Sequence, residues 1–349
     1  MANRDWTVDR PSLCYNGKLT FQEASLQQKV LGATGLMVSE IGFGASPLGD
    51  EFRKTDPAEG VRAVHAAIDR GINFFDVSPY YGRKLAEERL GIALEGRRNK
   101  VVLATKCGRY DTSLFDFSAA RLRASIDESL SRLRTDYVDL WQAHDVEFVD
   151  ARQIVDEAIP AMREIQKQGK VRFIGITGLQ LKMLRSIADQ APVDTFLSYC
   201  RYNLLMNDLD HLLTGFAKQR NIGLINASPL HMGILTESGP PAWHPASPEV
   251  VDASRTIVKA CEARGYKVGD VALRFCLDHP YAAITLVGMS TVQHVERNIA
   301  AVECRPPAEL IAEIRQLAAP VANRWWPTGR EENWDYGAGC DPGFASHAI

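Results

Sequence analysis

Between residues 39 and 302 the chain alternates short apolar segments with longer segments of helical periodicity. Segments such as INFFDV and KVVLATK are almost continuously apolar, which is typical of parallel strands whose outer face is covered by helices. The pattern predicts strands at residues 39–45, 72–77, 100–106, 137–144, 171–177, 194–200, 222–228 and 283–288. Helices are predicted at 57–71, 84–94, 118–134, 150–170, 181–189, 208–220, 249–265, 268–279 and 291–302. We expect Ser118 to cap its helix and Pro160 to kink the one that contains it.

Strict alternation over this length favours an α/β fold of the (β/α)8 TIM-barrel type. The rival is a doubly wound sheet, which usually has fewer strands and a phosphate loop after the first one. Here the first strand runs into GFGASPLG, which lacks the G-x-G-x-x-G spacing and leads to a proline instead of a helix. We therefore expect one barrel domain at residues 29–322, an N-terminal extension at 1–28 and a C-terminal tail at 323–349.

Composition argues against several other classes of protein. The formal net charge of -3 gives no basic footprint for nucleic acid. The N-terminus lacks an apolar core of signal length, and no stretch approaches the roughly 18 apolar residues of a membrane span. The seven cysteines form no C-x-x-C pair, which argues against a disulfide framework or a zinc site. We expect a cytoplasmic protein with reduced thiols and no metal, nucleic-acid or membrane partner; its oligomeric state does not follow from the sequence.

Polar side chains stand at the carboxyl ends of three consecutive predicted strands. Asp76 ends the second strand and is followed by Tyr80 and Tyr81, while Lys106 and His144 end the third and fourth. Each residue has an ordinary reading by itself: a turn cap, a solvated lysine, a structural histidine, or tyrosines that roof the barrel. Because the active residues of a barrel gather at the carboxyl ends of its strands, we expect these side chains to converge at one mouth.

This combination of groups suits proton transfer. A free phenol has a pKa of about 10, too high for easy ionisation near neutrality. A lysine about 4 Å away contributes roughly 4 kcal/mol, or about three pKa units at most, at an effective dielectric near 20. We therefore expect a lysine neighbour to bring one tyrosine into range as a general acid or base. A proton relay of this kind needs a partner reaction, and hydride transfer with a nicotinamide cofactor fits.

Several motifs between residues 29 and 305 resemble those of the aldo-keto reductases, among them KVLGATGLMVSEIGFGA, INFFDVSPYYG, YVDLWQAHD and VGMSTVQHVERNIAAV. The resemblance implies that Tyr81 is the catalytic tyrosine, with Asp76, Lys106 and His144 completing a tetrad. It leaves Tyr80 as a substrate-facing residue.

The resemblance also implies a nicotinamide cofactor that lies extended across the mouth. The implied cofactor-binding residues are Gly44, Ala45, Thr177, Gly178, Tyr199, Ser228, Leu230, Gly233, Gly288, Ser290, His294 and Asn298. Three positions depart from the common pattern of the family. Thr177-Gly178 stands for Ser-Asn, Tyr199 for a glutamine, and Ala227 for a stacking tyrosine.

The expected cofactor is NAD, with NADP less favoured. NADPH-preferring relatives carry a lysine and an arginine where this chain has Gly288 and His294. Fewer fixed cations weaken the binding of a 2'-phosphate, which favours charge-assisted donors. Main-chain groups at Ser290 and Thr291 can still meet a phosphate at a helix N-terminus. Charges from elsewhere, such as Arg297, are the alternative.

The loop SPLHMGILTESGPPAWHPAS after the seventh strand carries Trp243 and His244, expected to form a flap over cofactor or substrate. With LSYC and FIGITGLQL it resembles the branch of the family that contains the L-galactose dehydrogenases and related bacterial aldose dehydrogenases. That branch implies an NAD-dependent aldose 1-dehydrogenase, which oxidises the anomeric carbon of L-galactose, L-fucose or a similar sugar to the lactone. The alternatives are an NADPH-dependent aldehyde or ketone reductase and a non-catalytic, cofactor-binding regulatory subunit.

Overall fold

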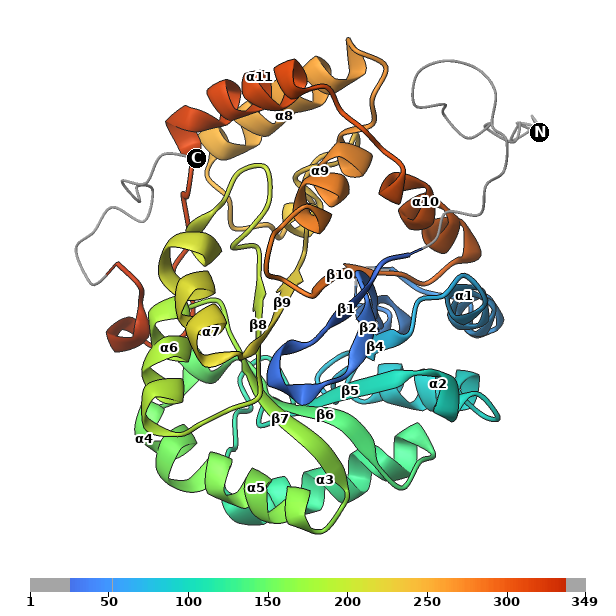
Figure 1. The fold of residues 1–349 in the computed structure, drawn as a ribbon, viewed down its shortest axis with the longest axis vertical. Helices are drawn as coiled ribbons and strands as arrows, with labels where there is room; N and C mark the ends of the chain where they lie inside the picture. The colour runs from blue at the N-terminus through green and yellow to red at the C-terminus, as the bar shows by residue number, and fades with distance from the viewer. Residues whose placement is uncertain (1–25, 52, 337–349) are drawn as a thin grey trace.

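The computed structural model describes residues 26–51 and 53–336. Eight parallel strands close into a barrel in the order β10-β3-β4-β5-β6-β7-β8-β9 (Figure 1). The strands are β3 (Ile41–Gly44), β4 (Phe74–Asp76), β5 (Val102–Cys107), β6 (Val138–Ala143), β7 (Val171–Thr177), β8 (Thr195–Tyr199), β9 (Gly223–Ala227) and β10 (Ile284–Gly288). Each coincides with a predicted strand, so the predicted (β/α)8 barrel is confirmed. The boundaries proposed for the extension and the tail stay predictions.

Most of the helices form a ring around the barrel, and α8 and α11 lie outside it (Figure 1). They are α1 (Pro57–Asp69), α2 (Leu85–Ala93), α3 (Ala119–Leu133), α4 (Ala151–Gln153), α5 (Ile159–Lys167), α6 (Leu181–Gln190), α7 (Gly215–Arg220), α8 (Pro248–Glu262), α9 (Val268–Leu277), α10 (Val292–Val302) and α11 (Ala308–Ala318). Ser118 caps α3 as predicted, because its side chain accepts a hydrogen bond from the Arg121 N–H. Within the described residues, no helix combines the length and apolar character that crossing a membrane requires.

The helix predicted at 150–170 is interrupted where a kink is expected. A π-helical turn at Ile154–Ala158 separates α4 from α5. Pro160 lies at the start of α5 and has no N–H to donate to the preceding turn, so the backbone widens there instead of continuing as a regular α-helix.

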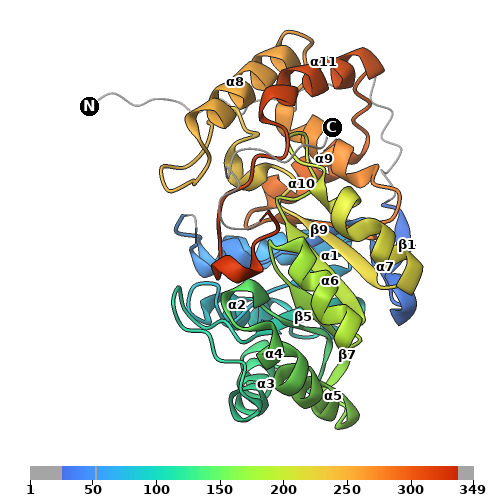
Figure 2. The same cartoon turned by 90° about the vertical axis from the view of Figure 1, so that its left-hand side faces the viewer.

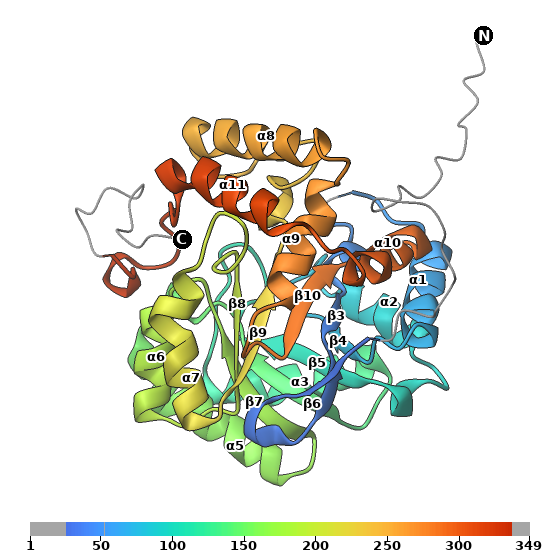
Figure 3. The same cartoon turned by 45° about the horizontal axis from the view of Figure 1, so that its top comes forward.

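One hairpin and one α-helix were not predicted. An antiparallel hairpin of β1 (Gln28–Val30) and β2 (Met37–Ser39) precedes the barrel, and α11 follows α10. The hairpin lies across the barrel in Figure 3 and closes its amino-terminal end. Its Leu31, Leu36 and Val38 form one buried cluster with inward-facing strand residues such as Phe74.

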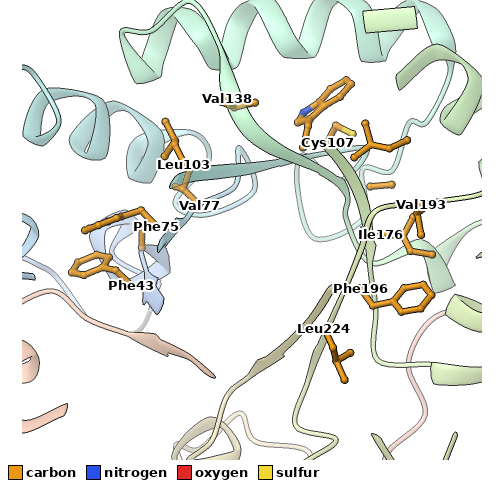
Figure 4. Close-up of a cluster of buried hydrophobic side chains, with 14 of the residues drawn as sticks. Phe43, Phe75, Val77, Leu103, Cys107, Val138, Ile176, Val193, Phe196 and Leu224 are labelled. Carbon is orange, nitrogen blue, oxygen red and sulfur yellow. The ribbon is translucent and has the colours of Figure 1, made fainter. Parts of the chain in front are cut away.

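The main core lies between the barrel and its helices. Figure 4 shows part of it, with Phe43, Phe75, Leu103 and Phe196 among the buried side chains. Because side chains alternate along a strand, Phe75 joins this outer layer while its neighbours Phe74 and Asp76 point inward. Each such buried side chain contributes about 1.5–3 kcal/mol of hydrophobic free energy. The barrel is thus rigid where its strands deliver polar groups to the mouth.

The segment after α11 returns to the barrel. Helices α8 and α11 lie side by side over α9 (Figures 1 and 3), and the following residues descend toward α6 (Figure 2). Near the end of the described chain, the Asp335 carboxylate accepts hydrogen bonds from the N–H groups of Leu181 and Lys182 at 3.0 and 2.8 Å. It therefore caps the first turn of α6 from a distant part of the sequence.

Candidate active site

The carboxyl ends of β4, β5 and β6 bring a buried ion pair and a phenol together. Asp76 and Lys106 form an ion pair with about 1% of each side chain exposed. The Lys106 ammonium also donates to the Val77 carbonyl at 3.0 Å and to the Tyr81 hydroxyl at 3.2 Å. Gln142 on β6 donates to the other oxygen of Asp76 at 3.0 Å. The carboxylate is held on two sides and in turn fixes the lysine beside the phenol.

The two adjacent tyrosines face different partners. The hydroxyl of Tyr81 contacts Lys106, whereas the centroid of the Tyr80 ring lies 3.9 Å from the guanidinium carbon of Arg109. The turn that follows them requires glycine at Gly82. This residue has φ 59°, and a Cβ there would lie 2.1 Å from the Gly49 carbonyl oxygen. The close approach of two backbones therefore sets how Tyr81 enters the mouth.

His144 lies beside both tyrosines, with ring centroids 5.7 Å from Tyr81 and 5.9 Å from Tyr80. Its Nδ1 is 3.0 Å from the Ser78 hydroxyl, which itself accepts a hydrogen bond from the Tyr80 N–H at 3.1 Å. Ser78 can donate its proton to Nδ1, and in that arrangement the imidazole proton is on Nε2. Burial, with the charges of Lys106 and Arg109, lowers the pKa of His144 well below its ordinary value. His144 is therefore neutral at neutral pH.

The expectation of an acidified tyrosine is wrong for the protein alone. Burial raises the pKa of Tyr81 to about 12, although the Lys106 ammonium pulls it down and the Asp76 carboxylate raises it further. Burial also opposes the charge of Lys106, but Asp76 and Tyr81 outweigh that effect and raise the pKa of its ammonium. Desolvation thus exceeds the benefit of the lysine, a balance that spacing in the sequence does not reveal.

Three further polar side chains at the mouth were not predicted: those of Arg109, Gln142 and Asp145. Asp145 pairs with Arg109, and its carboxylate lies 3.6 Å from Nε2 of His144. Gln142 could have been found, since it precedes His144 by two residues and so shares its face of the strand. Arg109 lies in the loop beyond β5, where no periodicity indicates direction.

Thr177 and Tyr199 end β7 and β8, the strands that follow β6 around the barrel, and Gly178 comes directly after Thr177. Thr177 accepts a hydrogen bond from the Asp145 N–H at 3.0 Å. A Cβ at Gly178 would lie 2.5 Å from a carboxylate oxygen of Glu147, whose pKa burial raises to about 8. The buried glutamate therefore explains why glycine stands where the family pattern has asparagine. Burial also raises the pKa of the Tyr199 hydroxyl.

A second group of candidate residues gathers where β10 meets β3. Gly288 on β10 pairs with Gly44 on β3, and Ala45 follows Gly44. Helix α10 begins a few residues after Gly288 and contains Asn298 in its second half. The Ser290 hydroxyl is buried and has no hydrogen-bond partner among the described residues. His294 lies 3.0 Å from an Arg53 nitrogen, while Arg297 contacts Asp270 and Glu237.

The loop after β9 begins at Ser228 and contains Leu230 and Gly233. Further along, Trp243 stacks on His244, and His244 packs against His231 and Trp326 of the C-terminal segment. A cavity of about 480 Å³ lies between this loop, the start of α8 and the C-terminal segment. Its walls include His231, Glu249, Arg324, Trp325 and Trp326. The structure thus joins the expected flap residues to the C-terminal segment.

Comparison with known proteins agrees with this geometry. The model of the aldo/keto reductase family matches residues 40–319. L-galactose dehydrogenase of Arabidopsis thaliana is 47% identical over 318 residues, 88% of this chain and 99% of that protein. D-threo-aldose 1-dehydrogenase of a Pseudomonas species is 28% identical over 84% of this chain and 98% of that one. An aldo-keto reductase of Bacillus halodurans, solved in its holo form, matches with a TM-score of 0.73 at 27% identity, covering 85% and 98% of the two chains. The chain therefore belongs to the aldo/keto reductase family and is an oxidoreductase.

Proposed function

We propose that the protein is an NAD-dependent aldose 1-dehydrogenase that oxidises the anomeric carbon of L-galactose, L-fucose or a similar sugar to the lactone. The observation that carries the proposal is the Tyr81 hydroxyl, held 3.2 Å from a buried lysine and beside a neutral histidine. The relatives named for L-galactose and for a D-threo-aldose support a sugar as substrate.

The residues around α10 fit a nicotinamide cofactor. The buried, unpartnered hydroxyl of Ser290 at the start of α10 is a donor suited to a phosphate oxygen, which a helix N-terminus also favours. Thr177 and Tyr199 end neighbouring strands, Ser228 follows the next one, and the three would line the nicotinamide end. When bound, the oxidised nicotinamide supplies the acceptor for the hydride that leaves the sugar carbon.

In the proposed reaction Tyr81 removes the proton of the C1 hydroxyl. The Lys106 ammonium stabilises the phenolate, and Asp76 holds that ammonium in place. The Nε2–H of His144 donates to the substrate oxygen and so orients it. A positively charged nicotinamide beside the phenol would lower the pKa of Tyr81 from its value of about 12 in the protein alone.

Two observations around α10 support NAD over NADP. The Glu59 carboxylate on α1 accepts a hydrogen bond from the Val292 N–H at 2.9 Å, and this bond and Arg62 lower the pKa of Glu59. Burial and Arg53 lower the pKa of His294, which is therefore neutral at pH 7. A carboxylate near a neutral histidine favours a ribose hydroxyl over a 2'-phosphate.

Arg53 favours the second candidate, an NADPH-dependent aldehyde or ketone reductase. Its guanidinium contacts His294 and could meet a phosphate there. Comparing kcat/KM for NAD and NADP in the oxidation direction, and for NADH and NADPH with simple aldehydes, separates the two candidates. A strong preference for NADPH with no aldose oxidation would replace the first proposal with the second.

The adjacent tyrosines provide a matched test of the proposed base. For Tyr81→Phe, we expect kcat for aldose oxidation to fall by about 10²–10⁴-fold, the usual contribution of a general base. For Tyr80→Phe, the hydroxyl lost does not contact Lys106, and we expect a much smaller effect. Steady-state rates of NADH formation over a panel of aldoses provide the measurement. Near-wild-type turnover by Tyr81→Phe would overturn the assignment.

A further inference from the structure

An ion pair stands at the mouth beside the proposed reacting position. Asp145 and Arg109 form a salt bridge with 4% and 15% of their side chains exposed. The Asp145 carboxylate lies 3.6 Å from Nε2 of His144, the atom that faces the substrate in the proposed reaction. A substrate oxygen held by His144 would therefore lie close to this pair.

The pair is rigidly held. Asp145 adopts a left-handed conformation with φ 52°, and its N–H donates to the Thr177 hydroxyl at 3.0 Å. Left-handed backbone is uncommon for a residue other than glycine and persists where surrounding structure demands it. Arg109 is fixed in turn by a backbone bridge to Phe115.

Aromatic rings surround the guanidinium. Its central carbon lies 3.9 Å from the ring centroid of Tyr80 and 5.4 Å from those of Phe115 and Phe148, and these two phenylalanine rings stack at 4.5 Å. All three rings are partly exposed. The mouth thus combines apolar faces with a charged donor and a charged acceptor, a combination that suits the C–H faces and hydroxyl groups of a sugar.

The pair is also incompletely satisfied. The Nε atom of Arg109 is buried and has no hydrogen-bond partner among the described residues. Burying two charges costs several kcal/mol per ion unless further hydrogen bonds satisfy them. Hydrogen bonds between a bound substrate and the partly exposed guanidinium would offset part of this cost.

We propose that Arg109 and Asp145 form a clamp for the sugar hydroxyl groups next to the anomeric carbon. The Asp145 carboxylate accepts from one hydroxyl and the Arg109 guanidinium donates to its neighbour. A plain aldehyde offers no such groups, so the clamp selects polyhydroxylated substrates. The proposal rests on the proposed function for the position of the reacting carbon, and it names the substrate class that this site takes.

The test compares an aldose with a simple aldehyde. For Arg109→Met and Asp145→Asn, we expect the ratio of kcat/KM for the aldose to kcat/KM for the aldehyde to fall by about 10- to 100-fold, the effect of losing a hydrogen bond to a charged group. Arg83→Met is the matched control, because Arg83 pairs with Asp111 in an exposed salt bridge. It should leave the ratio unchanged. Thermal melting of each variant checks that the fold persists.

Monodeoxy sugars locate the contact. If the clamp holds a given hydroxyl, the wild-type protein loses kcat/KM on the analogue that lacks it, and Asp145→Asn loses little more on that analogue. Equal losses on the aldose and the simple aldehyde would overturn the clamp and leave a structural ion pair. Wild-type protein that reduces simple aldehydes but oxidises no aldose would instead overturn the proposed function, and the clamp with it.

Discussion

At the scale of single residues, the decisive balance is between burial and charge at Tyr81. The lysine neighbour was predictable, because parallel strands deliver Asp76 and Lys106 to the same end of the barrel. The direction of the pKa shift was not, because desolvation depends on the packing around the hydroxyl. Residue spacing likewise could not choose between Tyr80 and Tyr81; the resemblance to the family did, and the Lys106 contact agrees with that choice.

The two perturbed groups predict the pH dependence of oxidation. Burial raises the pKa of Tyr81 to about 12 and lowers that of His144 well below its usual range. Phenolate therefore forms increasingly as pH rises, while His144 stays neutral throughout. We expect log kcat/KM for the aldose, at saturating NAD, to rise with pH from 6 upward with a slope of about one until the pKa of Tyr81 in the cofactor complex is reached. A second change of slope in this pH profile, near the ordinary histidine pKa, would show that His144 titrates there and would contradict the structure.

At the scale of elements, the strands were predictable because both of their faces are buried, which makes them continuously apolar. The β1–β2 hairpin was not predictable, because each strand has only three residues and includes exposed positions, so its sequence resembles that of a loop. The π-helical turn at Ile154–Ala158 also lies beyond a periodicity argument, although Pro160 marks its position.

The packing of α1 against the start of α10 predicts a change of cofactor preference. In Glu59→Gln combined with His294→Arg, the carboxylate near Val292 is neutralised and a cation is added close by. We expect the ratio of kcat/KM for NADP to that for NAD to rise by roughly 10- to 100-fold, because a 2'-phosphate gains a charge-assisted donor.

Glu296→Gln is the control for that change, because Glu296 lies on the same helix and pairs with Arg70 at the surface. An NADP/NAD ratio unaffected by the double variant would mean that the adenosine end of the cofactor lies elsewhere.

At the scale of the whole molecule, contacts between distant parts of the chain hold the C-terminal segment against the barrel. Arg201, after β8, is buried between Asp208 and Asp335, at 2.7 and 2.8 Å. The C-terminal segment also contacts the loop after β6, where the Glu147 carbonyl accepts from the Arg330 N–H and the Asn333 amide. Arg201 and Glu147 are each separated by well over a hundred positions from the C-terminal residues that they contact, so no local pattern reveals these contacts.

The C-terminal segment should therefore depend on one carboxylate. Asp335→Asn removes the charge that pairs with Arg201 and weakens the cap of α6, and breaking a buried ion pair costs about 3–5 kcal/mol. Because this lost free energy favours local release of the segment, we expect proteolytic cleavage near the C-terminus to accelerate by about 100-fold or more while the barrel stays folded.

Glu332→Gln is the control, since Glu332 pairs with Arg330 in an exposed salt bridge. Equal cleavage rates for wild type, Asp335→Asn and Glu332→Gln would show that other contacts hold the segment in place. Faster cleavage with a raised KM for the aldose would show that the segment also shapes the substrate mouth, because it contacts the loop that carries Asp145.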